Sequence, residues 1–173
     1  MTFASLAALG STGLAALLSL CLGLKFEAPA GWESLPKSSM MRVAEFKLPR
    51  AEGDTEDAQV AVYNFGSMMG GSVEANIARW LGQFDPKEGE PSIVKPKDEK
   101  ADPKITIVDV TGTYVAETRP GSGEKLNKPG WRMIAAVVES KEGTYYVKAV
   151  GPKASIAKNA DAIKAYAASA KPE

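Results

Sequence analysis

The sequence predicts an α+β domain: a mostly antiparallel sheet of about six strands, with its helices packed on the sheet, in the order β-β-β-α-β-β-β-α. Short runs with strand-like alternation are joined by Pro/Gly turns, which favours antiparallel pairing. Residues 131–139 are apolar on both faces, as in a central strand covered on both sides. Two stretches with helical periodicity follow the third and the last of these strands.

The strongest helical signal lies between residues 72 and 84. Ser72 is a good N-cap, because its hydroxyl can accept a backbone N–H that the first turn leaves unpaired. Five apolar residues then form one stripe at i, i+4, i+7, i+8 and i+11: Val73, Ile77, Trp80, Leu81 and Phe84. We therefore expect a helix that lies across the sheet and buries Trp80 against it.

Three strands are expected before this helix. A short strand begins at Leu24 and runs into a Pro/Gly turn. Residues 41–48 alternate between apolar and charged side chains and end at Pro49, and residues 58–65 form the next strand, so the two make an antiparallel hairpin. The acidic turn between them lacks the spacing of a calcium loop, and we interpret its carboxylates as solvated: Glu52, Asp54, Glu56 and Asp57.

After the helix, residues 85–103 hold four prolines and ten charges, which predicts a solvated connection with a short edge strand at 92–94. The segment 117–130, rich in Gly, Pro and Lys, is expected to form a mobile hairpin loop. A last helix begins after Gly151-Pro152, since Pro suits the first helical position. The remaining strands are expected at residues 105–115, 131–139 and 144–150.

Charge and residue usage exclude several classes of function. Twenty-one basic and 21 acidic residues balance, so no net field attracts nucleic acid. The chain has no histidine, the commonest general base and transition-metal ligand, so we predict a non-catalytic protein with no catalytic residue, no metal site and no cofactor. Asp109, in an apolar strand, is expected to form a structural ion pair with Arg42 or Arg132. The glycine-rich segment 66–72 lacks the lysine of a phosphate-binding loop and predicts a tight turn.

The first 24 residues contain no charge, and all 42 charged residues follow them. We assign residues 1–23 to a signal, lipoprotein or membrane-anchor segment and residues 24–173 to a single α+β domain. Cys21 resembles the acylated cysteine of a bacterial lipoprotein signal, although Leu20 stands where Gly, Ala or Ser normally precedes it. Ordinary cleavage near Cys21, and retention as an anchor or a plain N-terminal helix, are the alternatives. The protein is accordingly expected to be exported, either periplasmic or membrane-tethered through this segment.

Two stretches resemble the PsbP-like group of α/β sandwich domains, which includes the bacterial periplasmic DcrB-type proteins. One is the opening Phe26-x-x-Pro29-x-Gly31-Trp32; the other runs from Tyr145-Tyr146-Val147 through Pro152 to Ala168-Ser169, similar to their last strand and closing helix. The likeness covers residues 24–171. It implies an extracytoplasmic accessory domain, not an enzyme, that binds other proteins or assists membrane complexes, and it transfers no site residue.

We therefore expect a non-catalytic accessory module that binds another protein of the bacterial envelope. The alternative is a small-ligand carrier with a pocket between sheet and helix. Asn76, Arg79 and Gln83 form a polar row off the apolar stripe of the first helix, and they are the candidate partner-binding residues. The segment 117–130, with its basic side chains, is the rival contact surface.

The location can be tested directly. Because the uncharged segment precedes an ordinary charged domain, we expect the native protein to fractionate with membranes or periplasm. If Cys21 is acylated, Cys21→Ser abolishes metabolic labelling with a fatty acid, while a Ser19→Ala control stays labelled. Full-length protein in the cytosol with Met1 still attached contradicts export.

Overall fold

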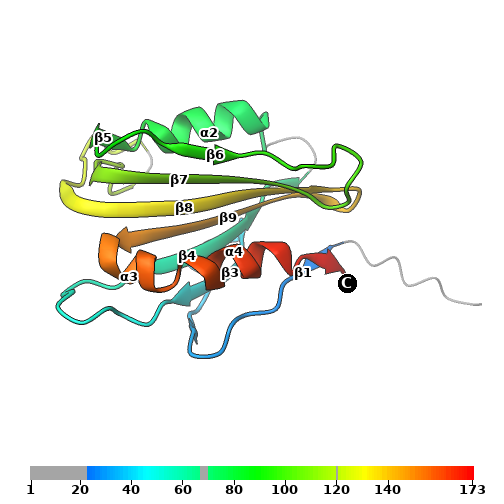
Figure 1. Cartoon of the computed structure of the whole chain (residues 1–173), viewed down its shortest axis with the longest axis horizontal. Coiled ribbons are helices and arrows are strands. Elements are labelled where there is room, and N and C mark those ends of the chain that lie inside the picture. The colour runs from blue at the N-terminus through cyan, green and yellow to red at the C-terminus, as the bar shows by residue number, and fades with distance from the viewer. Residues whose placement is uncertain (1–22, 67–69, 120) are drawn as a thin grey trace, which may run out of the picture.

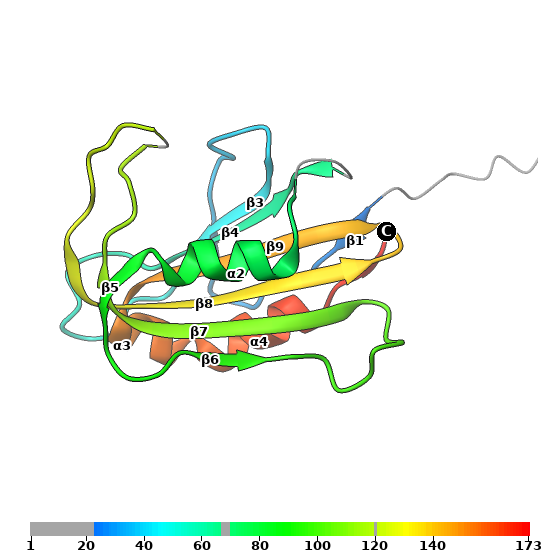
Figure 2. The same ribbon diagram turned by 90° about the horizontal axis from the view of Figure 1, so that it is seen from above.

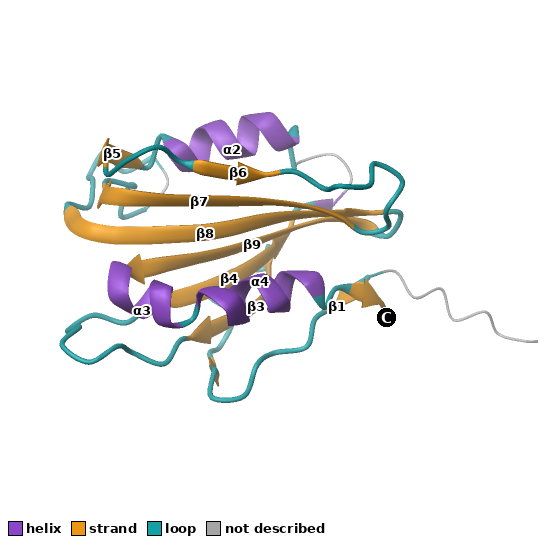
Figure 3. Ribbon diagram, in the orientation of Figure 1, coloured by secondary structure: helices purple, strands orange, loops and turns teal. Residues whose placement is uncertain are grey.

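An eight-stranded antiparallel sheet separates two helical layers (Figure 1). The computed structural model describes residues 23–66, 70–119 and 121–173. One helix, α2 (Val73–Leu81), covers one face of the sheet, and the consecutive helices α3 (Lys153–Lys158) and α4 (Ala160–Ala168) cover the other. Figure 3 shows the same three layers by secondary structure.

The main sheet has the strand order β2-β3-β4-β9-β8-β7-β5, and β6 also pairs with β7. A separate two-stranded ribbon joins the two ends of the described chain, β1 to β10. The strands are β1 (Leu24–Lys25), β2 (Glu33–Ser34), β3 (Arg42–Lys47), β4 (Gln59–Asn64), β5 (Phe84–Lys87), β6 (Ser92–Val94), β7 (Lys104–Tyr114), β8 (Lys128–Ser140), β9 (Gly143–Pro152) and β10 (Lys171–Pro172).

The predicted α+β class and antiparallel sheet are confirmed, as are the hairpin of β3 with β4 and the short edge strand β6. The sheet is larger than the expected six strands. The strands that the sequence did not indicate are β2, β5 and β10, which are two to four residues long and mostly exposed. Such short, polar pieces gain their order from a neighbouring strand and carry no alternating apolar pattern of their own.

The central strand β8 is apolar on both faces, as predicted. Its even-numbered side chains pack under α3 and α4: Ile134, Ala136 and Val138. Its odd-numbered side chains pack on the side of α2: Met133, Ala135 and Val137. All six are at most 3% exposed, so this one strand belongs to two cores and needs a cover on each side.

The helix α2 lies over β8 and β9 (Figure 2), with Trp80 only 4% exposed, as predicted. The predicted helix was too long at its end, because α2 stops at Leu81 with Gly82 as its C-cap. Phe84 instead opens β5, where it is fully buried in the same core as Trp80. Its spacing therefore matched a helical stripe although the chain had already turned into a strand.

On the opposite face, aromatic side chains from both ends of the domain meet. Phe26 lies 5.7 Å from Tyr145 and 5.3 Å from Tyr166, measured between ring centroids. Trp32 lies 5.2 Å from Tyr166 and 5.6 Å from Phe46. Phe26 and Trp32 of the opening stretch thus pack on the core that α4 covers, and the opening and closing stretches of the domain contact each other.

The predicted N-terminal segment, with Cys21, lies outside the described residues. Among residues 23–66, 70–119 and 121–173, no helix is long and apolar enough to cross a membrane.

Truncation of Trp80 tests how much the packing of α2 on the sheet contributes to the stability of the domain. Trp80→Ala should lower the free energy of unfolding by about 3–5 kcal/mol, as truncations of large buried side chains do. The exposed Lys164→Ala on α4 serves as the control and should change it by less than about 0.5 kcal/mol. Urea denaturation followed by circular dichroism measures both. A Trp80 variant as stable as the control contradicts the packing of α2 on the sheet.

Candidate functional site

A cavity of about 610 Å³ opens beside α2, over the β3, β4 and β9 part of the sheet. Two projecting hairpins flank it, the one that leads from β2 into β3 and the one between β7 and β8, and both extend from the same side of the molecule (Figure 2). The floor is hollow because Lys148 of β9 pairs across the sheet with two small residues, Ala61 of β4 and Ala135 of β8. The volume lies in the range of small-molecule sites.

Positive charge is concentrated in this cavity. Four of its lining residues are cations and one, Glu117, is a carboxylate; the cations are Arg42, Arg79, Lys125 and Lys148. The whole chain, by contrast, has equal numbers of basic and acidic residues. This local excess makes the cavity a site for negative charge.

Lys148 is the most unusual of these groups. Its Nζ donates to Oε1 of Gln83 at 2.6 Å and to Oη of Tyr114 at 3.1 Å, both neutral acceptors. Burial, and after it the charges of Arg79 and Arg42, together lower the pKa of Lys148 to about 8. Within the described residues, Lys148 forms no salt bridge.

The two arginines differ in how they are held. Arg42 donates to the buried carboxylate of Glu45 at 2.6 Å and lies over the ring of Tyr63, 5.2 Å from its centroid. Arg79 is exposed and donates to Oδ1 of Asn76 at 2.6 Å, a neutral amide. Arg42 is thus matched by a carboxylate, whereas Arg79, which also lines the cavity, donates to a neutral amide and forms no salt bridge within the described residues.

Aromatic side chains make the walls. Tyr63 and Phe65 of the β4 side are stacked, with centroids 5.8 Å apart and an interplanar angle of 16°. Trp80 and Tyr146 meet edge to face at 6.2 Å. The fifth ring, Tyr114, is 8% exposed, and burial raises the pKa of its phenol to about 12, so it stays protonated at neutral pH.

The predicted partner-binding row takes an unexpected place in this arrangement. Asn76 is 3% exposed rather than solvated, because its Nδ2 donates to the backbone oxygens of Gly70 at 2.6 Å and Ser72 at 2.9 Å. Gln83 is half-buried and accepts from Lys148. Only Arg79 is exposed as expected, so the row is not a solvated helix face. Partner binding by these residues remains a prediction.

The described part of the glycine-rich turn serves to anchor α2. Besides Asn76, the hydroxyl of Tyr146 donates to the Gly70 oxygen, at 3.0 Å. A Cβ on Gly70 would lie 2.6 Å from that hydroxyl, and Gly71 has a φ of +67°, so both positions favour glycine. The interpretation as a tight turn is consistent with these contacts.

Other polar groups that the sequence singled out have structural partners. Asp54 accepts from the backbone N–H and the hydroxyl of Ser155 at 2.9 and 2.6 Å, at the start of α3. Asp109 accepts a bidentate pair from Arg132 at 2.8 and 2.6 Å, which confirms the predicted ion pair with the second of its two expected partners. In the acidic turn, Glu56 pairs with Lys128 at 2.6 Å.

A second cavity, of about 780 Å³, lies on the other side of α2, against β6 and β7. Its apolar lining includes Val73, Ile77 and Ile93, and its charged lining residues are three carboxylates and two lysines: Glu74, Glu99, Glu139, Lys95 and Lys104. Because these charges nearly balance, this cavity selects for no particular charge, and the basic cavity is the stronger candidate site.

Sequence reasoning missed the centre of the site. Lys148 is the only charged residue in the last long strand, and it falls in the same alternating phase as Tyr146 and Val150. A lysine at an inward-facing position of a central strand was therefore a visible signal. Arg42, Tyr63 and Tyr114 could not be linked to it, because only the strand order brings β3, β4 and β7 around the end of α2.

Comparisons with known proteins place the fold in context. No protein family matches the chain, and no curated protein does. Among solved structures, the chain is similar to the solution structure of cyanobacterial PsbP (CyanoP) from Synechocystis sp. PCC 6803, with a TM-score of 0.48 and 12% identity over 97% of this chain and 99% of that chain. The match names the same group as the resemblance found in the sequence and is a statement about fold alone.

Lys148 should lower the free energy of unfolding of the domain when no ligand is bound. The difference between its pKa of about 8 and the ordinary 10.5 corresponds to roughly 3 kcal/mol at pH 7. Lys148→Met should therefore raise the free energy of unfolding by about 1–3 kcal/mol at pH 7, less than the full amount because Gln83 and Tyr114 lose a donor.

The stabilisation expected for Lys148→Met should depend on pH. Between about pH 8 and 10.5 the unfolded chain binds more protons at Lys148 than the folded one, so wild-type stability gains as pH rises, and the advantage of Lys148→Met shrinks. Denaturant unfolding at pH 7 and pH 10 measures this. Lys153→Met, at an exposed lysine, is the control. A destabilised Lys148→Met at pH 7 contradicts the unfavourable burial.

Proposed function

We propose that this domain binds a small anionic molecule that carries an apolar or aromatic part, and that it acts by binding rather than catalysis. The observation that carries the proposal is Lys148, a half-buried cation held by neutral acceptors in an aromatic cavity beside two arginines. Natural proteins retain groups that reduce stability chiefly where function needs them. An anion in the cavity supplies the counter-charge that the free site lacks.

The lining specifies the shape of the ligand. The guanidinium of Arg79 presents a planar fork that matches a carboxylate, and Lys148 adds a second donor deeper in the cavity. The stacked rings of Tyr63 and Phe65 offer a flat apolar surface for the remainder of the molecule. Aromatic carboxylates of modest size combine these features.

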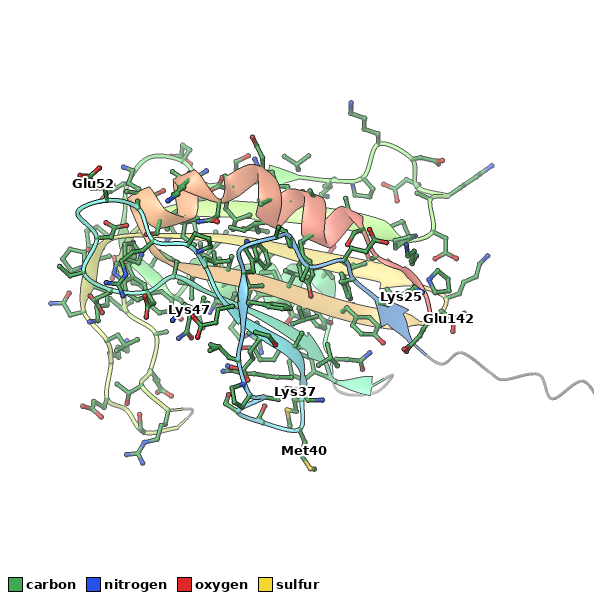
Figure 4. The ribbon with its side chains drawn as sticks, turned by 90° about the horizontal axis from the view of Figure 1, so that it is seen from below. Lys25, Lys37, Met40, Lys47, Glu52 and Glu142 are labelled. Carbon is green, nitrogen blue, oxygen red and sulfur yellow. The ribbon has the colours of Figure 1, made fainter. Side chains whose placement is uncertain are left out.

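A second candidate is an acidic segment of a partner protein, in line with the accessory role in the bacterial envelope that the sequence suggests. Met40 is fully exposed at the tip of the hairpin that leads into β3, on the same loop as Lys37 (Figure 4), and Met41 and Val43 are 47% and 42% exposed. This apolar group adjoins Arg42 at the cavity, a combination that favours a protein contact. Loss of a partner from a native-membrane pull-down with Arg79→Ala supports this candidate.

Ligand binding can be tested with 3-phenyllactate in a two-dimensional NMR titration of the folded domain. Amide shifts should centre on Tyr63, Gln83, Tyr114 and Lys148. Arg79→Gln should weaken binding roughly tenfold or more, because it removes a charge-assisted hydrogen bond. Arg119→Gln, at an exposed arginine outside the cavity lining, is the matched control. Affinity should fall as pH rises from about 7 to 9.5, because Lys148 loses its proton near pH 8.

The neutral analogue 3-phenylpropane-1,2-diol separates charge recognition from apolar contact. It retains the ring but lacks the carboxylate, and we expect it to bind more weakly than 3-phenyllactate by a similar factor. Equal affinity for the two molecules, or shifts confined to the cavity on the other side of α2, would contradict the anion site.

A further inference from the structure

We propose that Lys148 captures carbonyl compounds covalently, through a reversible imine between its Nζ and the carbonyl carbon of an anionic ketone or aldehyde. The class that fits the cavity is a 2-oxo acid with an apolar or aromatic side chain. The inference rests on the proposed function, because the same arginine and aromatic walls must first hold the anion.

The nucleophile is the first requirement. An amine attacks a carbonyl only when it is unprotonated, and desolvation together with neighbouring cations is the usual way in which proteins prepare a lysine for this step. Lys148 meets both conditions, since it is half-buried in the cavity, where it is desolvated, and Arg79 and Arg42 act on its charge. Because its pKa is lowered to about 8, a far larger fraction of Lys148 than of an ordinary lysine is free amine at pH 8.

Placement of the electrophile is the second requirement. A 2-oxo acid carries its carboxylate on the carbon next to its carbonyl, so a carboxylate held by Arg79 places the carbonyl carbon in the same cavity as the amine of Lys148. The bound carboxylate opposes the lowered pKa, both by pairing with Arg79 and through its own negative charge, whereas burial, the larger cause, persists. The ring of the side chain can lie against Tyr63 and Phe65.

The step balances without any further reactant. The lone pair of Nζ forms a C–N bond as the carbonyl π bond opens, and the amine proton passes to the oxygen, giving a carbinolamine. The C–O bond then breaks and water leaves, so amine and ketone yield imine and one water. The phenol of Tyr114, which is protonated and lies 3.1 Å from Nζ, can donate a proton to the departing hydroxyl and regain one from the nitrogen.

The test uses phenylpyruvate as the probe, with sodium cyanoborohydride at pH 8 to reduce any imine to a stable secondary amine. Intact mass and peptide mapping should find one adduct per chain, at Lys148. Lys148→Arg keeps the positive charge and should lose that adduct, and Arg79→Gln should lower its yield roughly tenfold at limiting probe. The exposed Lys141 is the internal control and should stay unmodified under these conditions.

The carbonyl-free 3-phenyllactate distinguishes the two levels of the proposal. It should protect Lys148 from the adduct by occupying the same cavity. If 3-phenyllactate binds in the cavity but phenylpyruvate gives no adduct at Lys148, imine capture is wrong and anion binding stands. If neither molecule binds, both are wrong. Adducts spread equally over Lys141 and Lys148, unchanged by Arg79→Gln, also overturn the inference, because they indicate ordinary surface reactivity.

Discussion

The lack of a polar face on β8 is the constraint on which the rest of the structure depends. A strand that is apolar on both sides must be covered twice, and the two covers come from different parts of the chain. The helices α3 and α4, with the aromatic residues of the opening segment, close one face. Among the described residues, the helix on the other face is α2, which at nine residues is shorter than α3 and α4 together. The basic cavity occupies sheet surface that α2 leaves open.

The position at which α2 ends determines which side chains lie over the uncovered part of the sheet. The helix stops at Leu81, and the chain passes through Gly82 and Gln83 into β5. Gln83 therefore reaches Lys148 from the end of the helix, where one more helical turn could have placed an apolar side chain over the sheet. On β9, the neighbouring position Tyr146 is covered through its bond to Gly70 at the other end of the helix. Both residues line the cavity, but Tyr146 is only 2% exposed and bound to the turn before α2, whereas Lys148, two residues later, is half-buried.

The sequence predicts the features that depend on periodicity within one segment. The two-faced pattern of β8, the burial of Trp80 and the hairpin of β3 with β4 are local patterns that the structure confirms. It predicted the end of α2 incorrectly because Phe84 is buried in the same core from a strand. Asn76 looked solvent-facing by spacing, but its exposure is decided by Gly70, six residues away, which folds back over it. The cavity itself depends on the strand order, which brings Arg42, Tyr114 and Lys148 together from positions more than a hundred residues apart at the extremes.

The excess of positive charge in the cavity lowers the stability of the free domain, and the same excess favours the proposed reaction with an anion. Desolvation is the main reason that the charged form of Lys148 is unfavourable, the charges of Arg79 and Arg42 add to it, and no carboxylate pairs with Lys148 within the described residues. A protonated imine with a 2-oxo acid keeps that positive charge but spreads it over nitrogen and carbon, and it brings a carboxylate that is covalently fixed one carbon away. In the proposed reaction the carboxylate is held in the cavity before the bond forms and stays beside the nitrogen of Lys148 as its counter-ion afterwards. A simple anion can balance the positive charge of the cavity. In the proposed reaction a 2-oxo acid balances the same charge and is also bonded covalently to Lys148. Such a site would select anions that carry a carbonyl group without needing a larger binding surface.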